Sequence, residues 1–93
     1  MSVEVVLPGV LADLAGGQKH LRMDVGGGTL GDLLDVLAAD HPLLGRRIRD
    51  ETGALRRFVN VYVDGEDARF GGALGASVRD GAVVQVLPSV AGG

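Results

Sequence analysis

The residues best suited to chemistry in this sequence are its last two, Gly92 and Gly93, which follow Val90 and Ala91. A glycine pair has no Cβ atoms, so this end of the chain fits a channel too narrow for other dipeptides. A terminal carboxylate is ionised at neutral pH. From Leu87 onward the extended chain spans roughly 20 Å, at about 3.3 Å per residue. We therefore expect Gly93 to react inside another protein's active site, with Val90, Ala91 and Gly92 fitting the channel that leads there.

No other group of residues in the sequence forms a catalytic or metal-binding pattern. His20 and His41 are far apart, and the sequence has no cysteine to serve as a nucleophile or metal ligand. The serines lie in no nucleophile motif, and the glycines at 26–28 lack the lysine and hydroxyl residue of a phosphate loop. We therefore predict no metal site, no cofactor bound by this chain and no enzymatic activity of its own. The chain is expected to lend a reactive group to an enzyme.

Length and composition indicate one globular domain. The chain has 93 residues, of which 46% are hydrophobic and 23% charged, and this balance is typical of a folded domain with one core. A net charge of −3 argues against non-specific binding to nucleic acid. The sequence contains no apolar run near 18 residues and no basic leader segment at its start. We expect a cytoplasmic protein that contacts neither membrane nor nucleic acid.

One helix is predicted clearly. Leucines and alanines recur at intervals of three and four over residues 30–39, which is the spacing of one helix face. Thr29 stands at the expected N-cap, and Asp32 three residues later completes an arrangement that resembles a capping box. A second, shorter helix or helical turn is indicated by Leu44 and Ile48. Residues 10–15 form either a short turn of helix or a loop.

Alternating apolar residues predict the strands. Strands are expected over residues 3–7, 18–25, 58–63 and 83–87, with a short edge strand over 66–70 and an irregular segment over 71–78. Two early strands, a crossing helix and further strands form an α+β fold with a mixed sheet and the helix on one face. This order is that of the β-grasp, or ubiquitin-like, fold. We expect the domain to occupy residues 1–87, with a flexible tail over 88–93 that ends in Gly-Gly.

The alternation also assigns residues to the two faces of the sheet. The helix side is expected to carry Val3, Val5, Leu7, Val59, Val61, Val63, Val84 and Val86. The open face would carry Glu4, Val6, Phe58, Asn60, Tyr62, Gln85 and Leu87. We predict that its apolar members, Val6, Phe58, Tyr62 and Leu87, form a partner interface beside the tail. Ordinary scattered surface residues are the alternative.

Residues 46–57 are rich in arginine. Five arginines stand against one aspartate and one glutamate, which leaves a local charge of +3. A solvated arginine-rich surface is the favoured interpretation, and a docking surface for an acidic partner is the sharper alternative. Nucleic-acid binding ranks third, because aromatic residues for base stacking are almost absent.

Four blocks of the sequence carry a resemblance to a known family, and together with the β-grasp pattern the resemblance covers nearly the whole chain. They are residues 16–19, 29–32, 57–63 and 80–93. The chain resembles the bacterial sulfur-carrier proteins of the MoaD/ThiS group, which are related to ubiquitin. The Phe-Val-Asn-x-Tyr-Val block at 58–63 and the Leu-Pro-x-Val-Ala-Gly-Gly end are most similar to the actinobacterial CysO-type branch, which serves cysteine biosynthesis. In molybdopterin-synthase small subunits a second proline often stands before the tail, and in this chain Ser89 occupies its position.

The resemblance implies a function centred on Gly93. In this family an E1-like adenylyltransferase uses ATP and Mg²⁺, both held by that enzyme, to adenylate the terminal carboxylate. Sulfur from another source then displaces AMP and leaves a thiocarboxylate, which donates its sulfur to a biosynthetic enzyme. In the cysteine branch the acceptor is a synthase that carries pyridoxal phosphate (PLP), and a metal-dependent peptidase releases the cysteine.

Three related functions remain open on the sequence. The chain is also similar to molybdopterin-synthase small subunits and to carriers that supply thiamin or specialised metabolites. These functions stay open because the pocket that accepts the sulfur lies in another protein. A ubiquitin-like protein modifier is a further alternative. Lys19 is the only lysine, which disfavours lysine-linked chains of this protein. The fourth alternative is an interaction module with an inert tail.

Overall fold

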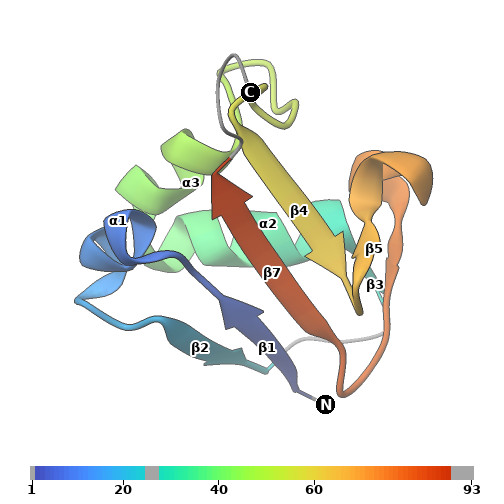
Figure 1. Ribbon diagram of the computed structural model, residues 1–93, viewed down its shortest axis with the longest axis horizontal. Coiled ribbons are helices and arrows are strands. Elements are labelled where there is room, and N and C mark those ends of the chain that lie inside the picture. Colours follow the sequence, from blue (N-terminus) through green and yellow to red (C-terminus); the bar gives the residue numbers. More distant parts are fainter. Residues whose placement is uncertain (1, 25–27, 89–93) are drawn as a thin grey trace.

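A computed structural model of the chain describes residues 2–24 and 28–88, and these residues form a mixed sheet with helices on one face (Figure 1). The main sheet has the strand order β2-β1-β7-β4-β5. Strand β7 runs parallel to β1 and antiparallel to β4, while the β1–β2 and β4–β5 pairs are antiparallel. The strands are β1 Val3–Val6, β2 His20–Met23, β4 Val59–Val63, β5 Glu66–Asp67 and β7 Val83–Pro88. The expected α+β, β-grasp arrangement is thereby confirmed.

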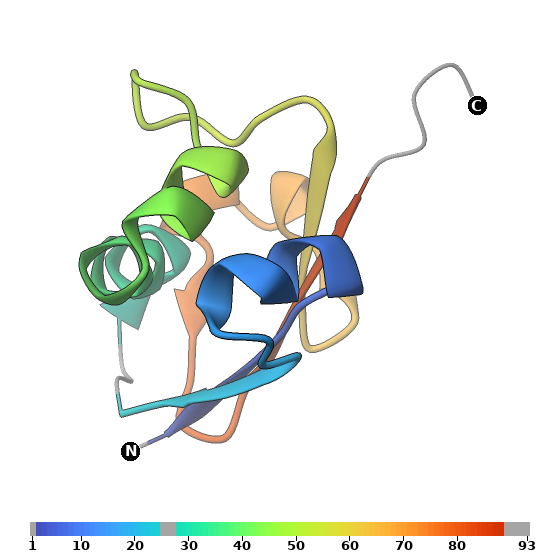
Figure 2. The ribbon, with the colours of Figure 1, turned by 90° about the vertical axis from the view of Figure 1, so that its left-hand side faces the viewer.

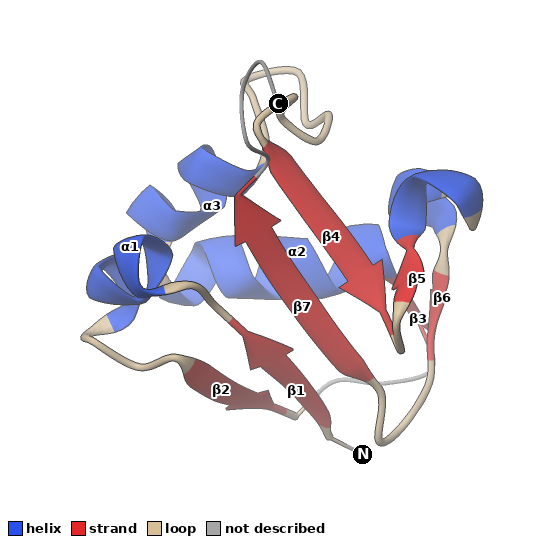
Figure 3. Ribbon diagram, in the orientation of Figure 1, coloured by secondary structure: helices blue, strands red, loops and turns tan. Residues whose placement is uncertain are grey.

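The two longer helices lie behind the sheet in the view of Figure 1, and all helices are coloured blue in Figure 3. The longest, α2, spans Leu30–Asp40, and α3 follows at Pro42–Ile48. A short helix, α1 at Gly9–Ala12, continues into the 3-10 turn η1 at Asp13–Ala15. Two further 3-10 turns, η2 at Ala68–Phe70 and η3 at Ala73–Gly75, stand beyond the β5 edge. No helix among residues 2–24 and 28–88 is long and apolar enough to cross a membrane.

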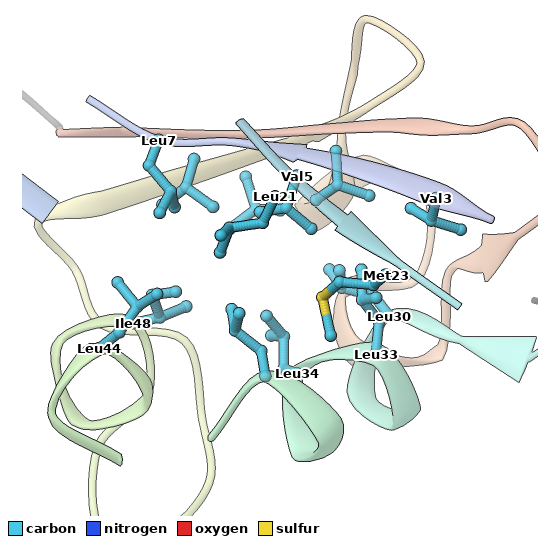
Figure 4. Close-up of a cluster of buried hydrophobic side chains, with 14 of the residues drawn as sticks. Val3, Val5, Leu7, Leu21, Met23, Leu30, Leu33, Leu34, Leu44 and Ile48 are labelled. Atoms are coloured by element: carbon cyan, nitrogen blue, oxygen red, sulfur yellow. The ribbon is translucent and has the colours of Figure 1, made fainter. Parts of the chain in front are cut away.

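The core lies between the sheet and α2 with α3, as Figure 4 shows. Inward valines of β1 and β7 meet the leucine face of α2, whose members Leu30, Leu33, Leu34 and Leu37 are each at most 2% exposed. Seven of the eight residues expected on the helix side are buried, and Val63 is partly buried against the same cluster. The alternation of the strands therefore predicted their inner face correctly, because one face of this sheet is packed and the other is open.

The start of α2 is set by the capping box that the sequence predicts. The Asp32 backbone N–H donates to Thr29 Oγ1 at 3.2 Å, and the Thr29 N–H donates to Asp32 Oδ2 at 3.1 Å. These two bonds satisfy donors that the first helical turn leaves without partners. The helix ends at Asp40, and Pro42 begins α3 at a position where its missing N–H costs nothing.

Gly45 allows α2 and α3 to approach closely. A Cβ atom added to Gly45 would lie 2.6 Å from Ala38 Cβ and 3.0 Å from Ala38 Cα. Leu44 and Ile48, on either side of Gly45, are both fully buried, so α3 is held against the core at this point. The helix pair therefore depends on a glycine that the sequence pattern does not single out.

Two expectations for residues 66–78 were wrong. The edge strand is limited to Glu66–Asp67, because Asp67 Oδ1 accepts a hydrogen bond from the Arg69 N–H at 2.9 Å and starts the η2 turn. The segment expected to be irregular contains η3 and β6, Ser77–Val78, which pairs with β3, Gly28–Thr29, in a second small sheet. Strands of two residues have no periodicity that a sequence pattern can reveal.

Candidate functional site

Strand β7 is the element that carries the predicted tail. It is central in the sheet, with β1 on one side and β4 on the other, and Val84 and Val86 are fully buried. Five register pairs join it to β4, the last of which places Pro88 opposite Val59. Proline has no N–H to donate to a strand ladder, and β7 ends at it. Pro88, where the predicted tail begins, is therefore the last residue of a firmly held strand.

The predicted reactive end lies outside the described residues. Gly93 and the three residues expected to fit a channel, Val90, Ala91 and Gly92, all belong to the segment 89–93. The roles assigned to them stay predictions. The described part of the site is therefore the base of the tail, together with the surfaces that surround the end of β7.

The open face of the sheet brings three of the four predicted interface residues together. Val6 on β1 and Tyr62 on β4 are both register partners of Gln85 on β7, one from each side. Leu87 follows on the same face of β7 and stands opposite Asn60. Its side chain is 41% exposed, whereas Val6 and Tyr62 are partly covered. These residues form an apolar strip, broken by two amides, that ends next to the base of the tail.

Phe58 has a different setting from the other three. It precedes β4, is 62% exposed and lines a groove at the end of the sheet together with Val10 and Pro88. Its place beside Pro88 keeps it close to the tail. The structure therefore divides the predicted interface into an open-face part and an end-groove part.

Arg69 orders one border of the open face, and the sequence patterns did not reveal it. Its guanidinium donates to Asn60 Oδ1 at 2.9 Å, to the Arg56 carbonyl at 3.0 Å and to the Val59 carbonyl at 2.8 Å. These bonds tie the η2 turn to the chain that enters β4. They also fix the Asn60 side chain beside Leu87. The sequence indicates this turn only through the Asp67-x-Arg69 spacing of a capped turn. An edge strand was predicted over the same residues instead.

The opposite border of the open face is charged. His20 Nδ1 lies 2.8 Å from Glu4 Oε2, and the side chain of His20 is largely exposed while that of Glu4 is half-exposed. Arg22 on β2 stands in register with Glu4 and is also exposed. The apolar strip is therefore flanked by polar groups, as is usual for a protein-binding surface.

The side chains of the arginine-rich segment, residues 46–57, differ in their surroundings. Arg49 Nη2 lies 2.9 Å from Asp35 Oδ1, and its side chain is largely buried. The loop at 50–54 closes on Asp50 Oδ1, which accepts hydrogen bonds from the Thr52 hydroxyl at 2.6 Å and the Thr52 N–H at 2.8 Å. The hydroxyl bond, followed by the backbone bond, lowers the pKa of the Asp50 carboxyl. Arg46, Arg47 and Arg57 are exposed.

The described ranges hold no cluster of three His, Asp or Glu side chains that could bind a metal ion. The site therefore consists of the end of a central strand, an apolar strip on one face of the sheet and the groove lined by Phe58 at its end. Such an arrangement can present a chain terminus and two surfaces to other proteins.

The strand order and the helices behind the sheet are those of a ubiquitin-like β-grasp domain. A model of the ThiS family matches residues 5–93. The "sulfur carrier protein CysO" of Mycobacterium tuberculosis is 42% identical over 95 residues, and the alignment covers both chains in full. "Small archaeal modifier protein 1" of Haloferax volcanii is 39% identical over 87 residues, with 90% of this chain and 95% of the relative covered.

Solved structures show the same similarity to CysO proteins. The crystal structure of Mycobacterium tuberculosis CysO has a TM-score of 0.84 and 40% identity, covering 95% of this chain and 99% of that one. The Amycolatopsis orientalis BexX/CysO complex contains a chain with a TM-score of 0.80 and 39% identity, covering 98% and 99%. The chain belongs to the ThiS family.

Proposed function

We propose that this protein is a sulfur carrier whose Gly93 carboxylate becomes a thiocarboxylate. The observation that carries the proposal is the full-length match, at 42% identity, to a protein named as a sulfur carrier. The central strand β7, held on both sides up to Pro88, supports it, because a tail needs a fixed base to be offered to a partner. The chain itself holds neither ATP nor Mg²⁺ in this proposal. Both belong to an E1-like activating enzyme.

The chemistry proceeds in two transfers. A carboxylate oxygen of Gly93 attacks the α-phosphorus of ATP, and pyrophosphate leaves, so that an acyl-adenylate forms. Sulfide then attacks the acyl carbon, and AMP leaves with the bonding electrons. Where a protein persulfide attacks instead, it forms an acyl disulfide, and a thiol of the sulfur donor or the activating enzyme then cleaves the S–S bond, releasing the thiocarboxylate and ending in a disulfide itself. The mixed anhydride is needed because a free carboxylate is a poor acyl donor. The product is a thiocarboxylate, whose sulfur is the nucleophile for the next enzyme.

Cysteine biosynthesis is the proposed destination of the sulfur. The support is the similarity to CysO carriers, at 42% identity in sequence and a TM-score of 0.84 in structure. The acceptor would be a PLP-dependent synthase, and a metal-dependent peptidase would release the product from Gly93. That a CysO chain occurs in a complex with BexX supports the wider point that such carriers dock on partner enzymes.

The experiment is co-expression with the E1-like enzyme of the same organism, followed by intact-mass measurement. The full chain is expected to gain the mass difference between one sulfur and one oxygen. A chain from which Gly93 has been deleted keeps the domain, but its terminal carboxylate then stands one residue short of the reacting position. Its mass is expected not to increase. Equal sulfur loading of the truncated chain would refute the proposal.

A protein modifier is the second candidate, favoured by the similarity to small archaeal modifier protein 1. In that case the activated Gly93 would form amide bonds with lysines of target proteins. A ladder of conjugates in extracts of cells that express a tagged chain would favour this function. Its absence under conditions where the thiocarboxylate accumulates would favour the carrier.

A further inference from the structure

A groove at the end of the sheet, separate from the open face, has the composition of a docking site. It measures about 480 Å³ and lies between α1, α3 and the ends of β4 and β7. Figure 2 shows the blue segment of α1 and η1 next to the green helix α3, and η1 and α3 are in contact. Its apolar walls include Val10, which is 72% exposed, and Phe58, which is 62% exposed. Large side chains that remain this exposed around one groove mark a surface suited to an apolar anchor from a partner.

Three arginines add positive charge to the same groove. They are Arg46 and Arg47, at the end of α3, and Arg56 from the following loop. All three are exposed, and within the described ranges none of them lies within 4.0 Å of a carboxylate oxygen. Asp50 interacts with Arg56 at longer range, so Arg46 and Arg47 carry most of the uncompensated charge. No acidic residue lines the groove either. The groove is therefore locally basic on a chain whose net charge is −3, so its charge favours an acidic ligand.

Arg56 is held in place across the groove. Its Nε donates to the Arg46 carbonyl at 2.6 Å, and its backbone N–H donates to the Ile48 carbonyl at 3.0 Å. Its own carbonyl accepts a bond from Arg69 at 3.0 Å. The loop that carries Arg56 is thus fixed to α3 and to η2. A positioned arginine costs less entropy on binding than a free one, which is a property of a prepared site.

The groove also shares a residue with the base of the tail. Pro88 lines it and is the residue from which the predicted tail continues. A protein that takes the tail into its active site must therefore lie within reach of the groove. The activating enzyme is the first protein that must do so, because no sulfur is loaded before adenylation.

We propose that this groove binds an acidic segment of the activating enzyme, with one apolar side chain of that segment inserted between Val10 and Phe58. The inference rests on the proposed function and adds a second contact to the open face. The arginines steer and hold the carboxylates, so the groove contributes to affinity and leaves the chemistry at Gly93 unchanged.

The first test uses the purified activating enzyme and measures ATP–pyrophosphate exchange against carrier concentration. The variant R46Q/R47Q removes two groove charges and leaves Arg56, which supports the loop, intact. Its KM for the carrier is expected to rise about tenfold, with kcat changed less than about twofold, and the rise should shrink with added salt. The control K19Q/R79Q removes two exposed charges away from the groove and is expected to match wild type.

The second test replaces Val10 with a photo-crosslinking amino acid and maps the product on the activating enzyme. A crosslink to an acidic stretch of that enzyme supports the proposal. The control places the same group at Phe70, which is 91% exposed and does not line the groove. A crosslink from position 10 to the chain's own C-terminal peptide, or to a second copy, would overturn the proposal in favour of that occupant.

The outcomes separate the two proposals. If the enzyme adenylates wild type and R46Q/R47Q with the same KM, the groove proposal is overturned while the carrier function stands. If position 10 gives no more crosslink than position 70, the groove proposal is likewise overturned. If the enzyme does not adenylate wild type at all, the proposed function is wrong and the groove proposal falls with it.

Discussion

Replacing Gly45 with alanine probes the closest approach of two helices in this domain. The new Cβ would lie 2.6 Å from Ala38 Cβ and 3.0 Å from Ala38 Cα. Ordinary contact between carbon atoms is about 3.5–4.0 Å, so α3 must move by about 1 Å or its neighbours must deform. Leu44 and Ile48 are fully buried and resist that movement. The substitution therefore strains the interface between α2 and α3.

The expected change in unfolding free energy for Gly45→Ala follows from two opposing effects. Overpacking of a buried contact costs roughly 1–3 kcal/mol of unfolding free energy. Alanine has a better helix propensity than glycine by about 1 kcal/mol, which offsets part of that cost. We expect a net destabilisation of about 1–2 kcal/mol and a fall in Tm of roughly 5–10 °C for a domain of this size.

The assay is urea unfolding followed by circular dichroism for Gly45→Ala, Ala38→Gly and the double variant. The double variant removes the 2.6 Å contact and keeps the 3.0 Å one, so partial rescue is expected. Its destabilisation should be smaller than the sum of the two single effects by about 1 kcal/mol. Gly75→Ala is the matched control, because no atom lies within 4 Å of the added Cβ and its φ is not positive. A stabilised Gly45→Ala, or additive single effects, would refute the packing argument.

Three further predictions test the helix cap, the open face and the Asp50 loop. Thr29→Ala removes one bond of the capping box and should lower the unfolding free energy by about 1 kcal/mol in thermal or urea unfolding. Leu87→Asp should weaken binding to the activating enzyme in calorimetry, whereas Val36→Asp, equally exposed on α2, should not; equal effects would contradict an open-face interface. Thr52→Val should raise the pKa of the Asp50 carboxyl toward its ordinary value, as measured by NMR titration. Because the folded pKa of Asp50 is lowered, its contribution to stability is present above the ordinary pKa and is lost as pH falls through the lowered one, so the variant should lose less stability on acidification.

Much of the fold was predictable because its signals are local. The leucine spacing over 30–39 and the pair Thr29 and Asp32 lie within one segment, and both predicted α2 correctly. Alternation in each longer strand assigned its inner face, since one face of the sheet is buried. The family resemblance, drawn from short blocks of residues, is confirmed by the ThiS match over residues 5–93.

The surfaces around the tail were less predictable because they depend on contacts between distant segments. Arg69 and Asn60 are joined through a 3-10 turn, and the sequence suggested an edge strand there. Phe58 shares a groove with Val10, although 47 residues separate them in the chain. No periodicity or motif encodes such a pairing.

The sequence by itself determined the helix and the inner face of the sheet, and the role of Gly93 stays a prediction from the sequence. Those features depend on residue type and on spacing within one element. Only the tertiary structure decided that Gly45 meets Ala38, that Arg69 holds Asn60 and that three arginines surround the groove beside Pro88. The physical reason is that side chains from separate elements become neighbours only after the elements have packed, and their distances then follow from the whole fold.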